Sequence, residues 1–470
     1  MKAPGKPCGV RCGRTEGAPG RLVGTDPTMS EPDRPALRLP WSRSDRAIPR
    51  TVVRPLQDFL RTTTASAVPM FLAAVVALAW ANSRWWESYE RLWATRVTIG
   101  VGRWGIHEDL RFWVGEGLMT FFFLLAGLEI KRELTSGELH DRRAALPPVV
   151  AAVAGMAVPA LIYLVVTHGT RAVDGWGMAM PTDLAFALGI LILVARSAPP
   201  GVRPFLLTLA IADDLLTIVV VAVAYANGFS VVPAALGLLC IGAMIACERA
   251  HVRHLLVYLA LGALVWLFAY HAGVHPALVG ALLGLLAPAH PFQRPGDVSE
   301  AAHRIADETS DHPDPPDSDA ASWFELARLS REAVSPLARI EHDLLPWVNL
   351  GALPLFALAN AGVRLSGLVW TSVTAALVVG LILARLVGKV VGIVGASALV
   401  ARTRPSARGV GAPAAAAAAA GAPFTVSLFV AASVFPEGSA LLAAARVGIM
   451  LSIVVCAGAA FGLARIPHRS

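Results

Sequence analysis

Residues 205–224 read FLLTLAIADDLLTIVVVAVA, an apolar stretch that carries Asp213 and Asp214 side by side near its middle. A run of roughly 20 apolar residues is long enough for a helix to cross a lipid bilayer. Each aspartate at the centre of such a helix costs on the order of 3 kcal/mol by insertion scales. A helix end at the water interface is the alternative, but apolar residues extend on both sides. The pair therefore predicts a membrane protein that moves cations or protons.

The rest of the chain has the composition of a polytopic membrane protein. Its 470 residues are 55% hydrophobic, with a mean hydropathy of +0.59, which excludes a soluble enzyme. The net charge of +7 is concentrated in the N-terminal region and in alternate loops, so positive-inside topology explains it better than nucleic-acid binding. Both termini are then expected to be cytoplasmic. We expect about twelve transmembrane helices, at 65–83, 113–130, 146–166, 176–195, 203–226, 231–247, 254–270, 276–288, 344–363, 370–395, 410–435 and 440–463.

Several segments outside these helices have a composition of their own. Residues 1–60 are basic and rich in Gly and Pro, which predicts a disordered tail, with Met29 as an alternative start, before a transmembrane domain at 61–465. Residues 96–106 alternate with a short period around turn glycines, which predicts a β-hairpin on the outer face. Its free edge strand favours a homodimer through this hairpin. Residues 290–340 are polar, acidic and Pro-rich, so we expect a flexible cytoplasmic loop.

A second acid and two basic residues occur in other apolar segments. Pro181 removes a backbone donor and disfavours helix before it, so it predicts an interrupted span in which Thr182 and Asp183 cap the half-helix that follows. The alternative is a helix that simply starts at Asp183. Lys389 lies in the tenth expected span and is expected to face the aspartate pair rather than to snorkel to the interface. Arg385, one turn away, is expected to snorkel.

These residues stand in motifs that resemble the bacterial NhaA-type Na⁺/H⁺ antiporters. The motifs, which occur in order along 60–465, are LLAGLEIKREL at 124–134, TDLAFALG at 182–189, AIADDL at 210–215, GVH at 273–275, EH at 341–342, PLFALANAGV at 354–363, GK at 388–389 and FTVSLF at 424–429. The resemblance implies an all-α fold of two inverted-topology repeats with interrupted helices, in a bacterial plasma membrane. It also implies a secondary transporter, not an enzyme, that exchanges Na⁺ or Li⁺ for H⁺ electrogenically, under pH regulation and without a cofactor.

The resemblance further implies roles for individual residues. Asp213 and Asp214 would bind the transported ion, Lys389 would form a salt bridge with Asp213, and Thr182 and Asp183 would lie at the interrupted fourth helix. A second group would belong to pH regulation: Glu129, Arg132, Glu133, His275, Glu341 and His342. On residue type alone, His275 is better explained as a packed or interface histidine.

The chain departs from the family pattern in four places: Pro276 after His275, Val390 in place of a proline, Pro423 before the FTVS motif, and the length of 290–340. Pro423 predicts a fixed interruption in the eleventh helix.

Two other function classes use intramembrane acids. An aspartyl protease would need Asp183 to face Asp213 and would give Lys389 no role. A channel would pass ions without proton counterflow. Within the antiporter hypothesis, Asp214 is the first choice for direct cation binding. Asp213 is the first choice for the residue that exchanges its partner, Lys389, for protons.

Overall fold

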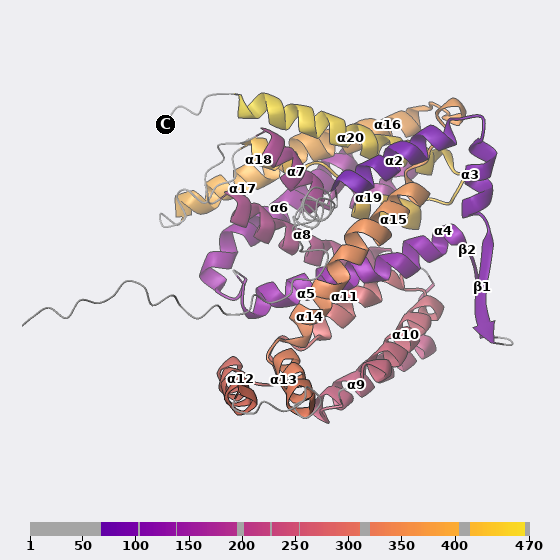
Figure 1. Ribbon diagram of the computed structural model, residues 1–470. Helices are drawn as coiled ribbons and strands as arrows, with labels where there is room; N and C mark the ends of the chain where they lie inside the picture. The colour runs from indigo at the N-terminus through magenta and orange to yellow at the C-terminus, as the bar shows by residue number, and fades with distance from the viewer. Residues whose placement is uncertain are drawn as a thin grey trace, which may run out of the picture. The chain divides into compact units, whose positions relative to one another are not determined.

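The computed structural model describes residues 67–101, 104–137, 139–194, 202–225, 228–252, 254–310, 320–403 and 414–465. All of them belong to one unit of the chain, Asp58–Ser470, and form an almost entirely helical bundle (Figure 1). The expectations for 1–60, including the tail and the start at Met29, fall outside the described residues.

Apolar helices build the bundle. Among the residues that the structure describes, eight helices are long and apolar enough to cross a membrane, or up to eleven if three bent pairs each count as one span. Up to the ninth expected span the helices are α2 (Ala67–Ala81), α3 (Trp86–Trp93), α4 (Leu110–Phe112), η3 (Trp113–Leu118), α5 (Met119–Thr135), α6 (Arg142–Val166), η4 (Arg171–Ala179), α7 (Leu184–Val194), α8 (Val202–Ala224), α9 (Val231–Arg249), α10 (Leu255–Ala272) and α11 (Ala277–Leu286). After them come α14 (Pro336–Trp347), η5 (Val348–Ala352), α15 (Leu353–Asn360), η6 (Leu365–Gly367), α16 (Ser372–Leu383), η7 (Ala384–Gly388), α17 (Lys389–Thr403), α18 (Ala414–Ala420), α19 (Thr425–Val434) and α20 (Ala440–Ala464).

Each of the twelve expected spans contains a helix, but α11 is too short to cross alone. Its 10 residues correspond to about 15 Å of helix, half of a hydrocarbon core. The sequence pattern could not show this, because the apolar composition continues past the residues that are helical.

The predicted hairpin is present. Strands β1 (Arg96–Val101) and β2 (Trp104–Asp109) pair antiparallel, with Ile99 opposite Ile106. The carboxylate of Asp109 then accepts a hydrogen bond of 2.8 Å from the backbone N–H of Phe112 and so caps the helix that follows. The hairpin therefore leads directly into the long span Leu110–Thr135.

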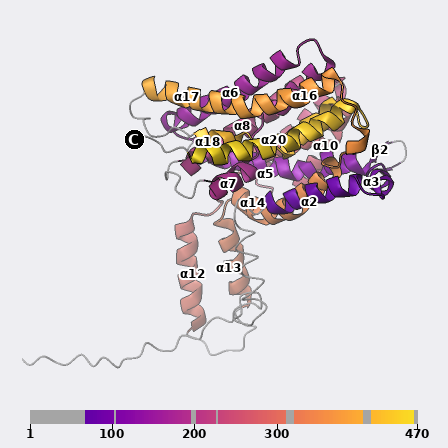
Figure 2. The same ribbon diagram turned by 90° about the horizontal axis from the view of Figure 1, so that it is seen from above.

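Residues 290–340, for which we expected a flexible cytoplasmic loop, are largely helical where the structure describes them. They contain α12 (Pro295–Ser310), α13 (Ala320–Glu332) and the start of α14, and α12 packs against α13 (Figure 2). The acidic, Pro-rich run at 311–317 dominated the composition. It concealed apolar residues at helical spacing in α12, such as Val298 and the buried Ile305.

Two interrupted helices cross in the bundle. The first consists of η4 and α7, bent by 59°, and the second of α18 and α19, bent by 43°. The first half of each packs against the second half of the other, η4 against α19 and α18 against α7. Pro181 lies in the first break and Pro423 in the second, as the sequence predicted, because a proline supplies no N–H to continue a helix.

Glycines allow two helix pairs to pack with their backbones in contact. A Cβ atom on Gly280 of α11 would lie 2.0 Å from the carbonyl oxygen of Thr120 on α5, and one on Gly284 would lie 2.5 Å from that of Leu124. The contacts advance together along both helices, so α5 and α11 run parallel. On α17, a Cβ on Gly392 would lie 2.5 Å from the carbonyl oxygen of Ala154 on α6. Close packing of this kind is common between membrane helices, which lack a hydrophobic driving force for association.

Candidate functional site

A π-helical turn places two buried cations beside the helix crossing. The turn η7 lies inside the long span Ser372–Arg402, immediately before Lys389. Such turns occur frequently at functional sites. Arg385 and Lys389 are four residues apart and share a face of the helix. Their side chains are 0% and 1% exposed.

Lys389 connects the aspartate pair to the first broken helix. Its Nζ donates a hydrogen bond of 3.0 Å to Oδ2 of Asp213 and one of 2.8 Å to Oγ1 of Thr182. The side chain therefore faces the acids, as expected, and does not snorkel. Because Asp213 lies on α8, this one ammonium group holds three segments of the bundle together.

Asp183 links the two broken helices at the N-termini of their second halves, α7 and α19. Its Oδ1 accepts a hydrogen bond of 3.3 Å from the backbone N–H of Phe186, so it caps α7 as predicted. Its Oδ2 accepts a hydrogen bond of 2.8 Å from the hydroxyl of Thr425 and one of 3.3 Å from its backbone N–H, at the start of α19. Helix N-termini carry partial positive charge, which favours a carboxylate here. The hydroxyl of Thr182 accepts a hydrogen bond from Lys389 and does not cap α7. Of the two predicted caps, only that of Asp183 is therefore found.

Asp213 and Asp214 point in different directions, since neighbouring residues diverge by about 100° around a helix. Asp213 is 0% exposed, whereas Asp214 is only partly buried. Among the described residues, Oδ1 of Asp213 has no hydrogen-bond partner, and neither has the buried hydroxyl of Thr217, one turn along the same face. No hydrogen bond or salt bridge of Asp214 is found in the described part of the chain. The two acids are therefore unequal, and oxygen atoms with free acceptor capacity lie close to them.

Arg385 corrects the snorkelling prediction. Its guanidinium group is fully buried and donates to the carbonyl oxygens of Met178 and Pro181 and to the hydroxyl of Ser427. The sequence could not reveal these acceptors, because they belong to segments some 40 and 200 residues away in the chain.

Tyr225 fixes η4 at the end of α8. Its hydroxyl accepts a hydrogen bond of 2.8 Å from the backbone N–H of Gly177 and donates one of 3.1 Å to the carbonyl oxygen of Asp174. Burial raises the pKa of Tyr225 to about 12, so the hydroxyl stays protonated and remains a donor.

The residues expected to take part in pH regulation lie in two places. At the far end of α5 from the hairpin, Arg132 forms a salt bridge of 2.5 Å with Glu341 of α14, and Glu129 interacts electrostatically with Arg132 and Glu341. Glu133 takes part in a further contact there. His342 is exposed, and the structure does not bring it into this cluster through any contact among the described residues.

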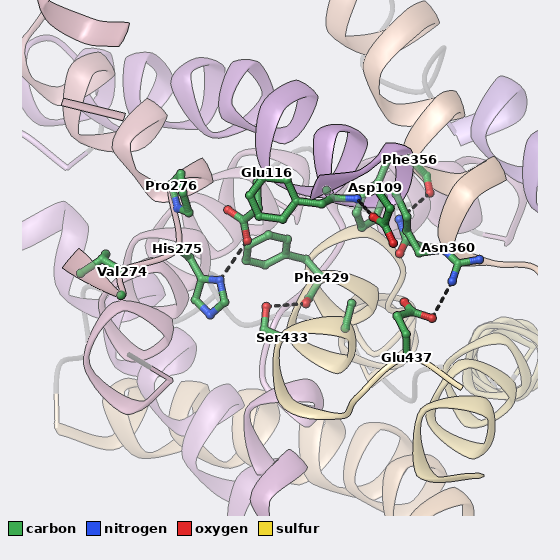
Figure 3. Close-up of a pocket in the computed structure, with 15 residues that line it drawn as sticks. Asp109, Glu116, Val274, His275, Pro276, Phe356, Asn360, Phe429, Ser433 and Glu437 are labelled. Atoms are coloured by element: carbon green, nitrogen blue, oxygen red, sulfur yellow. Dashed lines mark hydrogen bonds and ion pairs between the residues drawn. The ribbon is translucent and has the colours of Figure 1, made fainter. Parts of the chain in front are cut away.

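His275 lies in a cavity of about 350 Å³ near the hairpin end of the bundle (Figure 3). Its Nδ1 is 2.9 Å from Oε1 of Glu116, and Oε2 of Glu116 accepts a hydrogen bond of 2.9 Å from the backbone N–H of Ala277. Glu116 is a buried acid that the sequence reasoning missed. Its position between two glycines inside the second expected span was a signal, of the same kind as that given by Asp213.

The acids at the crossing do not form a shared catalytic or metal-chelating cluster. Asp213 pairs with Lys389 and Asp183 with Thr425, which does not match the facing acids that a protease needs. Among the described residues there is no group of three or more His, Cys, Asp and Glu side chains arranged to hold a metal ion. A cation bound at this crossing would take its other ligands from hydroxyl, carbonyl or water oxygens.

Comparison with known proteins agrees with this geometry. Residues 57–463 match the family described as Na⁺/H⁺ antiporter 1. The chain is 40% identical over 441 residues to Na⁺/H⁺ antiporter NhaA 2 of Sorangium cellulosum (strain So ce56), which covers 90% of this chain and 92% of the relative. It is 37% identical to the Na⁺/H⁺ antiporter NhaA of Janthinobacterium sp. (strain Marseille), over 87% of this chain and 92% of that one. Against the antiporter NhaA of Anaeromyxobacter sp. (strain Fw109-5) it is 40% identical, over 86% and 89% of the two chains.

Proposed function

Because the chain belongs to the NhaA family of Na⁺/H⁺ antiporters, we propose that it exchanges sodium for protons at the helix crossing, with Asp214 as the first ligand of the cation. The protein is a multi-pass secondary transporter, not an enzyme. One observation carries the assignment. Asp213 is bound to Lys389 and Asp183 to Thr425, which leaves Asp214 as the acid at the crossing with no hydrogen bond or salt bridge in the described part of the chain.

Competition between the cation and protons for the same carboxylates supplies the coupling. When the site faces an alkaline cytoplasm, Asp214 is ionised and binds Na⁺ or Li⁺, and Asp213 turns from Lys389 to complete the site with its second oxygen. When the site faces outward, protons displace the ion and Lys389 pairs with Asp213 again. A ligand shifts a conformational equilibrium only through its differential affinity for the two states, so each bound species must favour reorientation.

The exchange is electrogenic if two protons replace one monovalent cation. Each net charge then moves through the membrane potential, at about 2.3 kcal/mol per 100 mV. Lys389 supports this proposal because it supplies a site for the second proton: it releases a proton when Asp213 turns away to bind the cation, and takes one up when the pair forms again, while Asp214 carries the first.

We assign pH regulation to the salt bridge between Arg132 and Glu341, with Glu129, Glu133 and His342 nearby in the chain, and to His275 at the other end of α5. Glu129 supports this role because it interacts electrostatically with Asp214 as well as with Glu341. Protonation in this cluster therefore changes the electric field at the cation site.

The protein is proposed to lie in the bacterial plasma membrane with both termini cytoplasmic. The alternation of basic loops supports this orientation. Exposed apolar side chains along α9 and α10, such as Leu238, Leu239 and Leu256, are suited to contact with lipid. Ile99 is 57% exposed on the two-stranded sheet, which supports a homodimer through 96–106.

Everted membrane vesicles test the cation site. Addition of Na⁺ should dissipate an imposed proton gradient, seen as dequenching of a pH-sensitive dye. Asp214→Asn should abolish this response, and Glu87→Gln, at an exposed residue of α3, should leave it unchanged at equal protein abundance. A wild-type response in Asp214→Asn or Asp213→Asn would refute the assignment. Sodium flux without proton counterflow would identify a channel.

A further inference from the structure

We propose that Arg385 is a second positioning residue of the transport site, which fastens the carbonyl end of one broken helix to the other broken helix and supplies a permanent positive charge to the crossing. The proposal rests on the proposed function, because it concerns the same crossing. It adds a residue to which the family resemblance assigned no role.

The contacts of Arg385 join both broken helices. Its Nη1 donates a hydrogen bond of 2.9 Å to the carbonyl oxygen of Pro181, and its Nη2 donates to the carbonyl oxygen of Met178 and to Oγ of Ser427. Met178 belongs to η4, Pro181 to the break that follows it, and Ser427 to α19. Among the described residues, no other side chain donates hydrogen bonds to both broken helices.

The chemistry of the acceptors explains why a cation is placed there. The last carbonyl groups of a helix have no intrahelical partner and carry partial negative charge. Burying them unpaired in the middle of a membrane is costly, because no water is present there to donate hydrogen bonds to them. Asp183 satisfies the positive ends of α7 and α19, and Arg385 satisfies the negative end of η4. The two residues therefore compensate opposite ends of the interruption.

An arginine suits this position better than a lysine. The guanidinium group is a planar fork with five N–H donors, so one side chain can reach acceptors on two helices at once. An ammonium group concentrates its donors at one point. In the described part of the chain Arg385 forms no salt bridge, in contrast to Lys389.

This difference gives the two cations different functions. The partner of Lys389 is a carboxylate for which the transported ions compete, so that pair opens and closes during the cycle. The partners of Arg385 are carbonyl and hydroxyl groups, which do not titrate. Its charge interacts at longer range with the thiol of Cys456 on α20 and with Asp213 and Asp183. It therefore keeps a positive charge beside these acids, and its hydrogen bonds hold the two broken helices in register.

Arg385→Met and Arg385→Lys separate the two effects in everted vesicles. Arg385→Met removes the charge at similar volume, so the acids hold protons more strongly, and the pH of half-maximal exchange should rise by about one unit. Arg385→Lys retains the charge but not the fork. It should keep the wild-type pH profile while the maximal rate falls severalfold. Arg364→Met, at an exposed arginine over the ring of Trp86, is the matched control and should change neither quantity.

Ser427→Ala keeps the experiment decisive if Arg385→Met does not accumulate in the membrane. It removes one acceptor and leaves the charge, so it should lower the maximal rate without moving the pH profile. The proposal is overturned if Arg385→Met, or both Arg385→Lys and Ser427→Ala, retain the wild-type rate and profile at equal abundance. Failure of the cation site itself would appear differently, as normal exchange by Asp214→Asn.

Discussion

Replacing Lys389 by methionine should destabilise the protein far more than removing an exposed ion pair of shorter length. The Nζ atom of Lys389 is 3.0 Å from Oδ2 of Asp213, and both side chains are 1% exposed. Arg91 and Glu87 on α3 are closer, at 2.7 Å, but their side chains are 78% and 59% exposed. Distance alone would rank the α3 pair as the stronger one.

Burial reverses that ranking. Removing one partner of a buried ion pair leaves an uncompensated charge and costs about 3–5 kcal/mol. An exposed pair four residues apart on a helix contributes roughly 0.3–0.5 kcal/mol, because water and salt screen it. We therefore expect a loss about ten times larger for Lys389→Met than for Arg91→Met.

The assay is the heat-denaturation midpoint of the detergent-purified protein. It is determined from the fraction of protein that stays monodisperse after heating. Measurements at several pH values test how the loss of stability changes with pH. The loss in Lys389→Met comes from a buried carboxylate without a partner, which is costly only while it is charged, so the loss should be larger at alkaline than at acidic pH. Adding Asp213→Asn to Lys389→Met should recover much of the loss at alkaline pH, because the orphan charge is removed.

Equal losses in Lys389→Met and Arg91→Met would refute the reasoning. So would a loss in Lys389→Met that does not change with pH and is not reduced in the double variant. Lys389 would then act through the packing of its aliphatic stem alone.

Three other expectations concern the two ends of α5 and its contact with α11. Gly280→Ala should lower the denaturation midpoint, since its Cβ would lie 2.0 Å from a backbone oxygen and overpacking costs about 1–3 kcal/mol; Gly242→Ala on α9, with nothing within 4 Å, should not lower it. Glu116→Gln removes the carboxylate that faces His275 in the cavity of Figure 3 and accepts the backbone N–H of Ala277, so it should also lower the midpoint. Glu341→Gln and Arg132→Gln should each change the pH at which vesicle exchange is half-maximal, and the double variant should differ from the sum of the two because they remove the same salt bridge; additive effects would show that the residues act separately.

The sequence was sufficient to predict the parts of this site that have few physical alternatives. Two adjacent acids in an apolar span must pair, titrate or face a cavity, and a proline in a span must interrupt it. Pro181 therefore lies in a helix break, and Lys389 pairs with Asp213, as expected. The hairpin followed from its period and turn glycines in the same way.

The remaining features depend on which segments meet in space. Whether Arg385 snorkels or is buried depends on acceptors from η4 and α19, which are distant in the chain. The partner of Glu116 is 159 residues away, so its role was invisible although its position in a span was not. The helices α12 and α13 were missed for another reason, because the composition of the acidic run between them outweighed the spacing of their apolar residues.

The glycine contacts between α5 and α11 have a mechanical consequence. Two helices whose backbones are in contact cannot slide or rotate past each other without a steric clash, so α5 and α11 move as one rigid body. Glu116 and Arg132 lie near opposite ends of the long span that contains α5, about 24 Å apart along the helix axis. A tilt of α5 that starts near Arg132 would therefore carry α11 and the segment around Glu116 with it.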